Sequence, residues 1–281
     1  MVSRSTDDLQ TVGAYQILGR LGRGGMGVVF RGRHRNHMVA ARQGGDVAIK
    51  VMHDEYARDA HYKEQFDKEA ALCMELYHSN IVRPFDLVLE HDTLALVMTL
   101  VEGETLRERL ERTGPIPSTV ALPLFRQLLD AIGYAHSEGV IHRDLKPSNI
   151  VISTAGQIQV LDFGIAKDMT EGTERTGRVM GTIDYMAPEQ YQDAGIVEAR
   201  ADVYALGITL YEMLAGRLPW TLETPVHVIA AIKAQESFPP PTTFYPFISD
   251  VLVDVLYRAT RADPAQRISS ISAFHAALAG L

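Results

Sequence analysis

The chain has 281 residues, which is enough for one large domain or two fused ones. Apolar residues make up 46% and charged residues 22%, as in ordinary globular proteins, so a disordered or fibrous protein is excluded. The formal net charge of −8 argues against nucleic acid or an anionic membrane surface as an electrostatic partner.

Targeting signals are missing from the sequence as given. The single cysteine, Cys73, cannot form an internal disulfide, so nothing indicates an oxidising compartment. No run reaches the roughly 18 consecutive apolar residues of a membrane span, and residues 1–11 are polar where a signal peptide needs an apolar segment. We therefore expect a cytoplasmic chain without a membrane span. A cytosolic part of a larger membrane-anchored protein also stays open.

The first part of the chain has the pattern of a small sheet. Residues 1–14 are polar, and we expect them to be flexible. From there to Val101, short β-branched runs bounded by turn residues predict five strands. These runs are Gln16–Leu21, Gly27–Gly32, Asp46–Met52, Val82–Glu90 and Thr93–Val101. Apolar residues at helical spacing predict one helix within Ala57–Tyr77, and His34–Gly45 is predicted to be a long exposed turn.

The second part of the chain is predicted to be mainly helical. Prolines separate the helical patterns, because proline restricts its predecessor and cannot continue a helix. The predicted helices are Thr105–Arg112, Ser118–Ser137, Asp202–Ala215, Val226–Gln235, Ile248–Arg261 and Ile268–Leu278. Strands followed by helices predict an α+β fold of two lobes, about 15–101 and about 102–281. A ligand site is expected in a cleft between two unlike lobes.

A glycine cluster lies between the first two predicted strands, at Gly22, Gly24 and Gly27. Glycines there let backbone amides approach phosphate oxygens that a Cβ atom would hold off. A dinucleotide-binding site would need a helix directly after this motif, and a strand follows instead. A phosphate-covering hairpin or a plain glycine-rich turn remains.

A lysine and a glutamate form the second candidate feature. Lys50 ends the apolar run of the third strand, where a charge at the sheet edge is the ordinary explanation. Glu69 shares a face of the predicted helix with Phe66 and Cys73, and an acid among apolar neighbours needs a partner. Lys50 is the candidate partner, and the pair would fix its ammonium group to meet phosphate oxygens.

The strongest signal is a set of three oxygen-bearing side chains. Asp144 and Asn149 lie in the run Ile141–Val151, which contains His-Arg-Asp-Leu-Lys-Pro-Ser-Asn, and Asp162 begins Asp-Phe-Gly after an apolar run. Carboxylate and amide oxygens suit Mg²⁺, which shares its coordination with water and substrate phosphates. A loop of solvated polar residues is the alternative, but it gives no reason to place all three beside apolar strands.

These motifs resemble the protein kinase superfamily in identity and in order, from about Tyr15 to Leu278. The order is glycine loop, Val-Ala-Ile-Lys, helix glutamate, His-Arg-Asp, Asp-Phe-Gly and Ala-Pro-Glu. The resemblance implies the bilobal protein kinase fold. Its N-terminal lobe would hold a five-stranded antiparallel sheet and one helix, and its C-terminal lobe would be mainly helical.

The resemblance also implies cofactors and roles. ATP and Mg²⁺ would be the cofactors, with Mn²⁺ as an alternative. Lys50 would hold the α- and β-phosphates and pair with Glu69, Asp144 would accept or orient the substrate hydroxyl proton, and Lys146 would neutralise the γ-phosphate. The residues assigned to the nucleotide are Leu21, Gly22, Gly24, Gly27, Val29, Ala48, Lys50, Met98, Leu100, Val101 and Val151.

Five further residues receive roles through the resemblance. Asn149 and Asp162 would hold the metal ion. Glu189 of Ala-Pro-Glu would bridge to Arg267, and Asp202 would be the buried helix acid that hydrogen-bonds the catalytic loop.

The kinase class follows from smaller motifs. The run Lys146–Asn149 and the Gly181-Thr182 pair are similar to Ser/Thr kinases, and Gly24–Gly27 together with Pro188–Gln190 resembles the eukaryotic-like Ser/Thr kinases of bacteria. We therefore predict an ATP-dependent kinase acting on protein Ser/Thr hydroxyls, with a transient homodimer for trans-autophosphorylation.

Two other classes are disfavoured by particular residues. A pseudokinase would lose Lys50, Asp144 or Asp162, and all three are present. A small-molecule kinase of the same broad fold lacks the Gly181–Glu189 segment, which would shape a peptide-binding groove.

Regulation is predicted from Arg143, a cation beside the catalytic Asp144. The segment up to Ala187 contains Thr173, Thr176 and Thr182 and lacks apolar periodicity, so we expect it to be mobile when unmodified. A phosphate on Thr173 or, preferably, Thr176 would bind Arg143 through charge-assisted hydrogen bonds. Thr182 is predicted to be a structural contact. The ordinary alternative is that these threonines are solvated loop residues.

Overall fold

Two compact units make up the computed structural model, which describes residues 9–24, 27–90, 93–163, 183–191, 199–220 and 239–281. The sheet unit comprises Met1–Tyr77 and Val82–Glu102, and the helical unit comprises His78–Ile81 and Gly103–Leu281. The division after Glu102 falls where the sequence changes from strand-forming to helix-forming runs.

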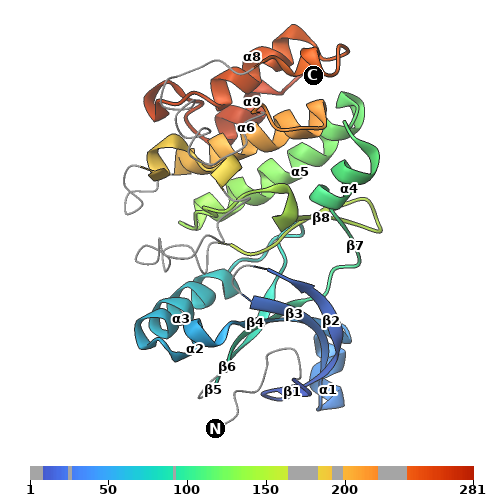
Figure 1. Ribbon diagram of the computed structural model, residues 1–281, viewed down its shortest axis with the longest axis vertical. Helices are drawn as coiled ribbons and strands as arrows, with labels where there is room; N and C mark the ends of the chain where they lie inside the picture. Colours follow the sequence, from blue (N-terminus) through green and yellow to red (C-terminus); the bar gives the residue numbers. More distant parts are fainter. Residues whose placement is uncertain (1–8, 25–26, 91–92, 164–182, 192–198, 221–238) are drawn as a thin grey trace. The chain divides into compact units, whose positions relative to one another are not determined.

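The sheet unit is built on a six-stranded antiparallel sheet in the order β1-β2-β3-β4-β6-β5 (Figure 1). Its strands are β1 (Thr11–Val12), β2 (Tyr15–Arg23), β3 (Gly27–His34), β4 (Asp46–Met52), β5 (Pro84–Glu90) and β6 (Thr93–Thr99). Five of them match predicted strands. The predicted number of five strands was one too few, because β1 was not predicted. Its residue Val12 pairs with Tyr15 and is buried. The expected flexible stretch 1–14 is thus ordered at Thr11–Val12.

The segment predicted as a long exposed turn contains a short helix, α1 (His37–Arg42). The side chain of Asn36 accepts a hydrogen bond from the amide of Met38 and caps the helix, and Ala40 is buried. Gly44 and Gly45, with φ of 85° and 106°, then turn the chain into β4. A six-residue helix with one buried residue leaves too little periodicity to be predicted.

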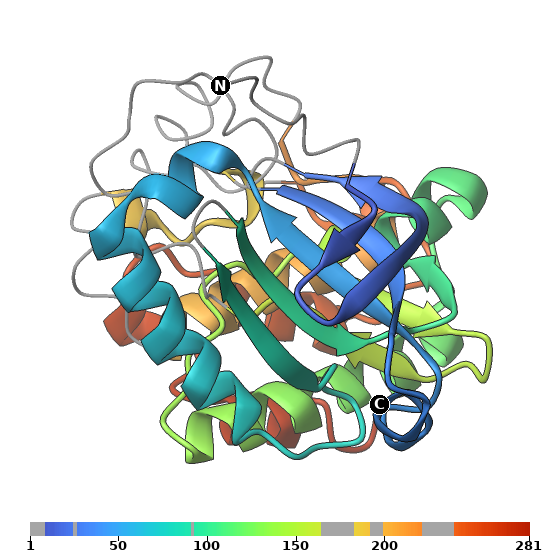
Figure 2. The same ribbon diagram turned by 90° about the horizontal axis from the view of Figure 1, so that it is seen from below.

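The main helix of the sheet unit is α3 (Ala60–Met74), preceded by α2 (Asp54–Arg58). Asp59 caps α3 by accepting from the amides of His61 and Tyr62. The helix buries apolar residues at helical spacing and contacts β5, beside which it runs in Figures 1 and 2. The buried residues are Tyr62, Phe66, Ala70 and Cys73. The predicted helix within Ala57–Tyr77 is therefore present.

The helical unit contains α4 (Leu106–Thr113), α5 (Ser118–Ser137), α6 (Ala199–Ala215), α8 (Asp250–Ala259) and α9 (Ile271–Ala277). All residues of α6 from Ala201 to Ala215 are buried, and this helix contacts α5 and α8. A three-stranded sheet, β7 (Gly103–Thr105), β8 (Ile150–Ser153) and β9 (Ile158–Val160), carries the loop that precedes β8. The predicted helix Val226–Gln235 lies outside the described residues. No described helix has both the length and the apolar character needed to cross a bilayer.

One short segment breaks the simple division of the chain at residue 102. His78–Ile81 belongs to the helical unit, although its flanking residues belong to the sheet unit. Asn80 donates to the carbonyl of Ile158 at 2.8 Å, and the amide of Val160 donates to the carbonyl of Asn80 at 2.8 Å. These bonds attach the segment to β9, a tertiary contact that the prediction of one continuous N-terminal lobe missed.

Candidate active site

Two of the predicted catalytic side chains and one predicted metal ligand meet in the loop between α5 and β8. The Nζ atom of Lys146 lies 2.8 Å from Oδ2 of Asp144. The amide nitrogen of Asn149 donates to the carbonyl oxygen of Asp144 at 2.9 Å and to its Oδ2 at 3.1 Å. The Asp144 and Lys146 side chains are 21% and 19% exposed, so both groups remain reachable by a substrate.

Asp202, on α6, anchors this loop. Its Oδ2 accepts from the amide of His142 and its Oδ1 from the amide of Arg143, at 2.8 and 2.9 Å. The ring of His136, on α5, contributes a third hydrogen bond to Oδ2 at 2.8 Å. Burial alone would raise the pKa of Asp202, but the bonds from His136 and His142 outweigh burial and lower it. The expected contact between this buried acid and the catalytic loop is present.

The ring of His142 connects the catalytic loop to the residues before Asp162. Its Nε2 lies 2.9 Å from the carbonyl oxygen of Leu161, and its Nδ1 faces the amide of Asp144 at 3.3 Å. An amide donates and a carbonyl accepts, so the contacts select the neutral ring with its proton on Nε2. Burial lowers the pKa of His142, which is fully buried, and favours the same neutral form.

Two non-glycine residues of the site have left-handed backbone conformations. The φ angle is 66° at Arg143 and 50° at Asp162. Such conformations cost on the order of 1–3 kcal/mol each and persist where the surrounding structure imposes them. Here the amide of Arg143 is held by Asp202, and the ring of Phe163 packs on that of His142 at 4.7 Å. The strain coincides with the residues that were predicted to be functional.

The predicted metal ligands fit Mg²⁺. Both hydrogen bonds of the Asn149 side-chain amide use its nitrogen, which leaves Oδ1 as the oxygen that could bind a metal ion. The amide of Leu161 donates to the carbonyl of Asn149 at 2.9 Å and brings these two segments together. Among the described residues no group of three or more His, Cys, Asp or Glu side chains would hold a metal ion. An ion with few protein ligands takes the others from water and phosphate, as Mg²⁺ does.

In the sheet unit, strand register aligns three of the predicted nucleotide residues. Gly22 on β2 lies opposite Val29 on β3, and Val29 lies opposite Lys50 on β4. Ala48, two residues before Lys50, lies opposite Met98 on β6. Directly paired residues share one face of a sheet, so these side chains form one surface.

The three glycines of the hairpin differ in the space that a Cβ atom would have at each position. A Cβ at Gly27 would lie 2.1 Å from the carbonyl oxygen of Val51, so the packing of β3 on β4 requires glycine there without any ligand. A Cβ at Gly22 would have no neighbour within 4 Å, and one at Gly24 would only touch the Gly27 carbonyl at 4.0 Å. Open space at Gly22 and Gly24 fits residues kept small for a phosphate group.

The remaining predicted nucleotide residues divide between the units. Leu21 is half exposed on β2, and Leu100 and Val101 directly follow β6 in the sheet unit. Val151 is buried on β8 of the helical unit. Glu69 lies on α3 between buried Phe66 and Ala70. Its pairing with Lys50 stays a prediction.

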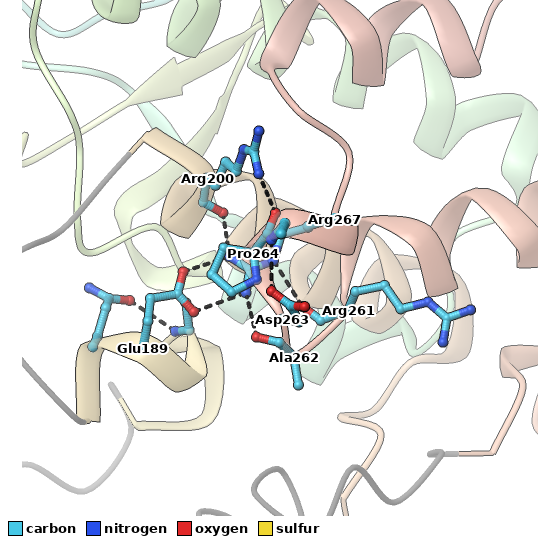
Figure 3. A network of polar contacts seen from close by, with 10 residues as sticks. Glu189, Arg200, Arg261, Ala262, Asp263, Pro264 and Arg267 are labelled. Carbon is cyan, nitrogen blue, oxygen red and sulfur yellow. Dashed lines mark hydrogen bonds and ion pairs between the residues drawn. The ribbon is translucent and has the colours of Figure 1, made fainter.

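The predicted bridge between Glu189 and Arg267 is present (Figure 3). The guanidinium donates to both carboxylate oxygens, at 2.7 and 2.9 Å, and its side chain is fully buried. Its other hydrogen bonds go to the carbonyl oxygens of Arg200, Arg261 and Ala262. All five donors are therefore used, as a buried arginine requires. The bridge ties the Ala-Pro-Glu turn to the segment between α8 and α9.

Some positions were missed or lie outside the described residues. His136 was not predicted, because its role depends on Asp202, which is distant in sequence. A polar cluster that no local sequence motif predicts is formed by Arg107, Tyr185 and Glu212. The predicted regulatory residues Thr173, Thr176 and Thr182 lie outside the described residues.

The fold and this catalytic loop define a class of protein. The chain belongs to the protein kinase family, whose protein kinase domain it matches over residues 15–278. It is 38% identical over 256 residues to the serine/threonine-protein kinase PrkC of Bacillus subtilis, covering 91% of this chain and 38% of that protein. With the serine/threonine-protein kinase Pkn1 of Myxococcus xanthus it shares 37% identity over 272 residues, 95% of this chain and 38% of that protein. It spans less than half the length of these relatives.

Solved structures agree with this assignment. The crystal structure of the PknI kinase domain of Mycobacterium tuberculosis is similar with a TM-score of 0.73 and 26% identity, over 98% of this chain and 98% of that one. The domain is a protein serine/threonine kinase, so the predicted enzyme class and the predicted fold are both confirmed. Its relatives in bacteria also agree with the predicted resemblance to bacterial kinases.

Proposed function

We propose that this domain transfers the γ-phosphoryl group of Mg-ATP to serine and threonine hydroxyls of proteins, and that the protein containing it acts in the cytoplasm through this activity. The observation that carries the proposal is the contact of Lys146 and Asn149 with one carboxylate oxygen of Asp144. In-line phosphoryl transfer needs a base, a cation and a side-chain oxygen that can bind the metal ion, and this one loop supplies all three.

The chain's residues have separate tasks in this mechanism. Asp144 accepts the proton of the attacking hydroxyl and orients it, since its carboxylate is held in place but still reachable. Lys146 places its positive charge beside Asp144, where negative charge develops on the transferred group. Mg²⁺, when bound at Asn149 and Asp162, neutralises phosphate charge. Lys50 holds the α- and β-phosphates and Glu69 orients it.

The acceptor class is proposed from the Lys146–Asn149 motif and from the names of the relatives. The test uses the purified protein, Mg-ATP and degenerate peptide libraries with Ser, Thr or Tyr as the acceptor, and mass spectrometry locates the phosphate. We expect transfer to Ser and Thr. Asp144→Asn protein, prepared in parallel, controls for contaminating kinases. Equal transfer to Tyr would contradict the proposed acceptor class.

We further propose regulation by autophosphorylation of Thr176 or Thr173, in trans through a transient homodimer. Arg143 directly precedes Asp144 in the sequence, and a phosphate on the threonine would bind its guanidinium through charge-assisted hydrogen bonds. Wild-type protein should show a lag that shortens as its concentration rises, and Thr173→Ala combined with Thr176→Ala should abolish the activation. An unchanged lag in the double variant would refute this regulation.

A further inference from the structure

The beginning of the sheet unit is strongly basic, although the chain as a whole is acidic. Residues 9–45 contain six arginines and no aspartate or glutamate, whereas the formal net charge of the chain is −8. Three of these arginines, Arg31, Arg33 and Arg35, alternate along β3 and just beyond its end, and all three are exposed. The candidate active site uses none of them, so their charge calls for a separate explanation.

One carboxylate joins two of these arginines. Nε of Arg31 donates to Oδ2 of Asp46, and Nε of Arg33 donates to Oδ1, each at 2.5 Å. The Asp46 side chain is 7% exposed, against 47% for Arg31 and 54% for Arg33. Desolvation alone would raise the pKa of Asp46, but the hydrogen bonds from Arg33 and Arg31 outweigh it and lower the pKa. Asp46 is therefore an ionised carboxylate with both of its oxygens in use.

Each of the two guanidinium groups keeps its other nitrogen atoms for a second partner. Within the part of the chain that the structure describes, Nη1 and Nη2 of Arg31 and Arg33 make no hydrogen bond. These two nitrogens form the end of a planar fork that binds carboxylate or phosphate oxygens in pairs. Because Asp46 holds the Nε atom of both groups, the two forks are in place before any ligand arrives, which lowers the entropic cost of binding one.

The neighbouring strands leave space beside the arginine pair. Arg31 lies opposite Gly19 on β2 and Ala48 on β4, which are both small. A Cβ at Gly19 would have no neighbour within 4 Å, so this side of Arg31 is open. Gln16 lies opposite Arg33 on β2, is exposed and adds the donors of its amide to the same face. An anion bound by the two forks would therefore have room and a further hydrogen-bond donor.

Fold stability does not require both arginines. One arginine is enough to compensate one carboxylate, and exposed ion pairs contribute little to stability. Two arginines on Asp46 leave one positive charge in excess, and Arg35, whose hydrogen bonds go to the carbonyl oxygens of Gly13 and Ala14, adds a second. A phosphate monoester brings a charge of about −1.5 to −2 and three acceptor oxygens. It matches this excess charge and two forks better than a carboxylate, which has one charge and two oxygens.

We propose that Arg31 and Arg33 form a binding site for a phosphoserine or phosphothreonine in a protein segment. A bilayer or a nucleic acid is a poorer match, because the net negative charge of the chain repels an extended polyanion. The site is separate from the predicted nucleotide residues, since Asp46 precedes Lys50 by four residues of β4, about 13 Å along a strand. A serine/threonine kinase with this site holds proteins that already carry the product of its own class of reaction.

The test measures binding of fluorescent degenerate peptide libraries to the whole chain by fluorescence anisotropy, without ATP. The libraries differ in one fixed central residue, which is phosphoserine, phosphothreonine, serine or glutamate. Both phosphopeptide libraries should bind at least about tenfold more tightly than the serine and glutamate libraries, and Mg-ADP should not displace them. Arg31→Ala and Arg33→Ala should each weaken phosphopeptide binding about tenfold, the loss expected for one charged hydrogen bond.

Two further variants separate a site with forks from a merely basic surface. Arg31→Lys combined with Arg33→Lys keeps both positive charges beside Asp46 but removes both forks, so it should lose most of the phosphopeptide affinity. Arg42→Ala is the matched control. Arg42 is an exposed arginine of the same basic stretch, but it lies in the last turn of α1, so its removal should change the affinity by less than about twofold.

Thermal melts show whether each variant is folded. If an alanine variant is not, the single variants Arg31→Lys and Arg33→Lys take its place, because each keeps the charge that pairs with Asp46. Full phosphopeptide binding by the double lysine variant, or equal binding of the glutamate and phosphopeptide libraries, would overturn the proposal. So would pair-dependent binding to phosphatidylserine vesicles in place of phosphopeptides. Since the readout is binding, a protein without transferase activity would refute the proposed function and leave this inference standing.

Discussion

In the helical unit the catalytic loop is held by buried polar groups, whereas in the sheet unit Lys50 is held by strand pairing. Asp202 binds two successive amides of the loop and the ring of His136. Lys50 lies opposite Val29 and Leu96 across β3 and β6, and the residues alternating with it in β4, Ile49 and Val51, belong to the core.

The two arrangements respond to different changes. A hydrogen-bonded anchor depends on single atoms, because a buried donor or acceptor that loses its partner pays the full cost of its lost hydration. A register held by strand pairing tolerates the loss of a side-chain atom but not an added one where strands pack closely. We therefore expect polar substitutions to be severe in the helical unit and volume changes to be severe in the sheet unit.

Within the sheet unit, the largest effect should come from Lys50, and it should fall on activity rather than on stability. Lys50→Met should lower kcat about 10²–10³-fold, the loss typical of one electrostatic contact to the reacting group. Glu69→Gln should lower kcat less, because Lys50 keeps its own charge. In the double variant the two effects should not add. Additive free energies would show that the residues act independently and that the proposed pair is wrong.

The anchor of the catalytic loop should follow. Asp202→Asn should lower kcat on the order of 10²-fold, because a small misplacement of Asp144 is enough to slow transfer. It should also lower the free energy of unfolding by roughly 1.5–3 kcal/mol, the worth of a hydrogen bond to a charged group. Asp130→Asn is the control, since Asp130 is exposed and its contact with the surface residue His275 is long, at 3.5 Å. Equal effects of the two variants in denaturant titrations and assays would contradict the anchor.

The same variant makes a pH prediction. The folded state lowers the pKa of Asp202, so this carboxylate stabilises the fold above its unfolded pKa of about 3.9 and loses that contribution as the pH falls through the folded value. The difference in unfolding free energy between wild type and Asp202→Asn should be constant near neutral pH and shrink below about pH 4. If the difference in unfolding free energy grew as the pH fell, Asp202 would not be the ionised carboxylate proposed here.

The smallest effects separate two glycines of one hairpin. Gly27→Ala should destabilise the protein by about 1–3 kcal/mol even without nucleotide, because its Cβ would meet the Val51 carbonyl. Gly22→Ala should leave the Tm unchanged and raise the KM for ATP, since its Cβ would enter open space. Thermal melts and ATP titrations distinguish the two. Equal Tm values for the two variants would contradict the packing role of Gly27.

Most of the fold was predictable, because the strands and helices carry clear apolar periodicities. The contact from Glu189 to Arg267 was also predicted, but only through the family resemblance. The helix α1 was missed, since one buried alanine gives no period, and β1 was missed, since a strand of two residues is too short to show an alternating pattern.

What escaped prediction in the site depends on tertiary partners. His136 and Arg107 have no local signal, because their partners Asp202 and Glu212 lie far along the chain. Gly27 had a local signal that was incomplete. The phosphate-covering motif gave a reason for glycine there, but the structure supplies a second one in the packing of β3 on β4.

The most direct measurement compares wild type with Asp144→Asn in two assays, phosphoryl transfer under single-turnover conditions and equilibrium binding of Mg-ATP. The account predicts a transfer rate lower by about 10²–10⁴-fold, the usual worth of a general base. Nucleotide affinity should be unchanged, because Asp144 acts on the hydroxyl and not on ATP. Near wild-type transfer by Asp144→Asn, with contaminating kinases excluded, would contradict the account.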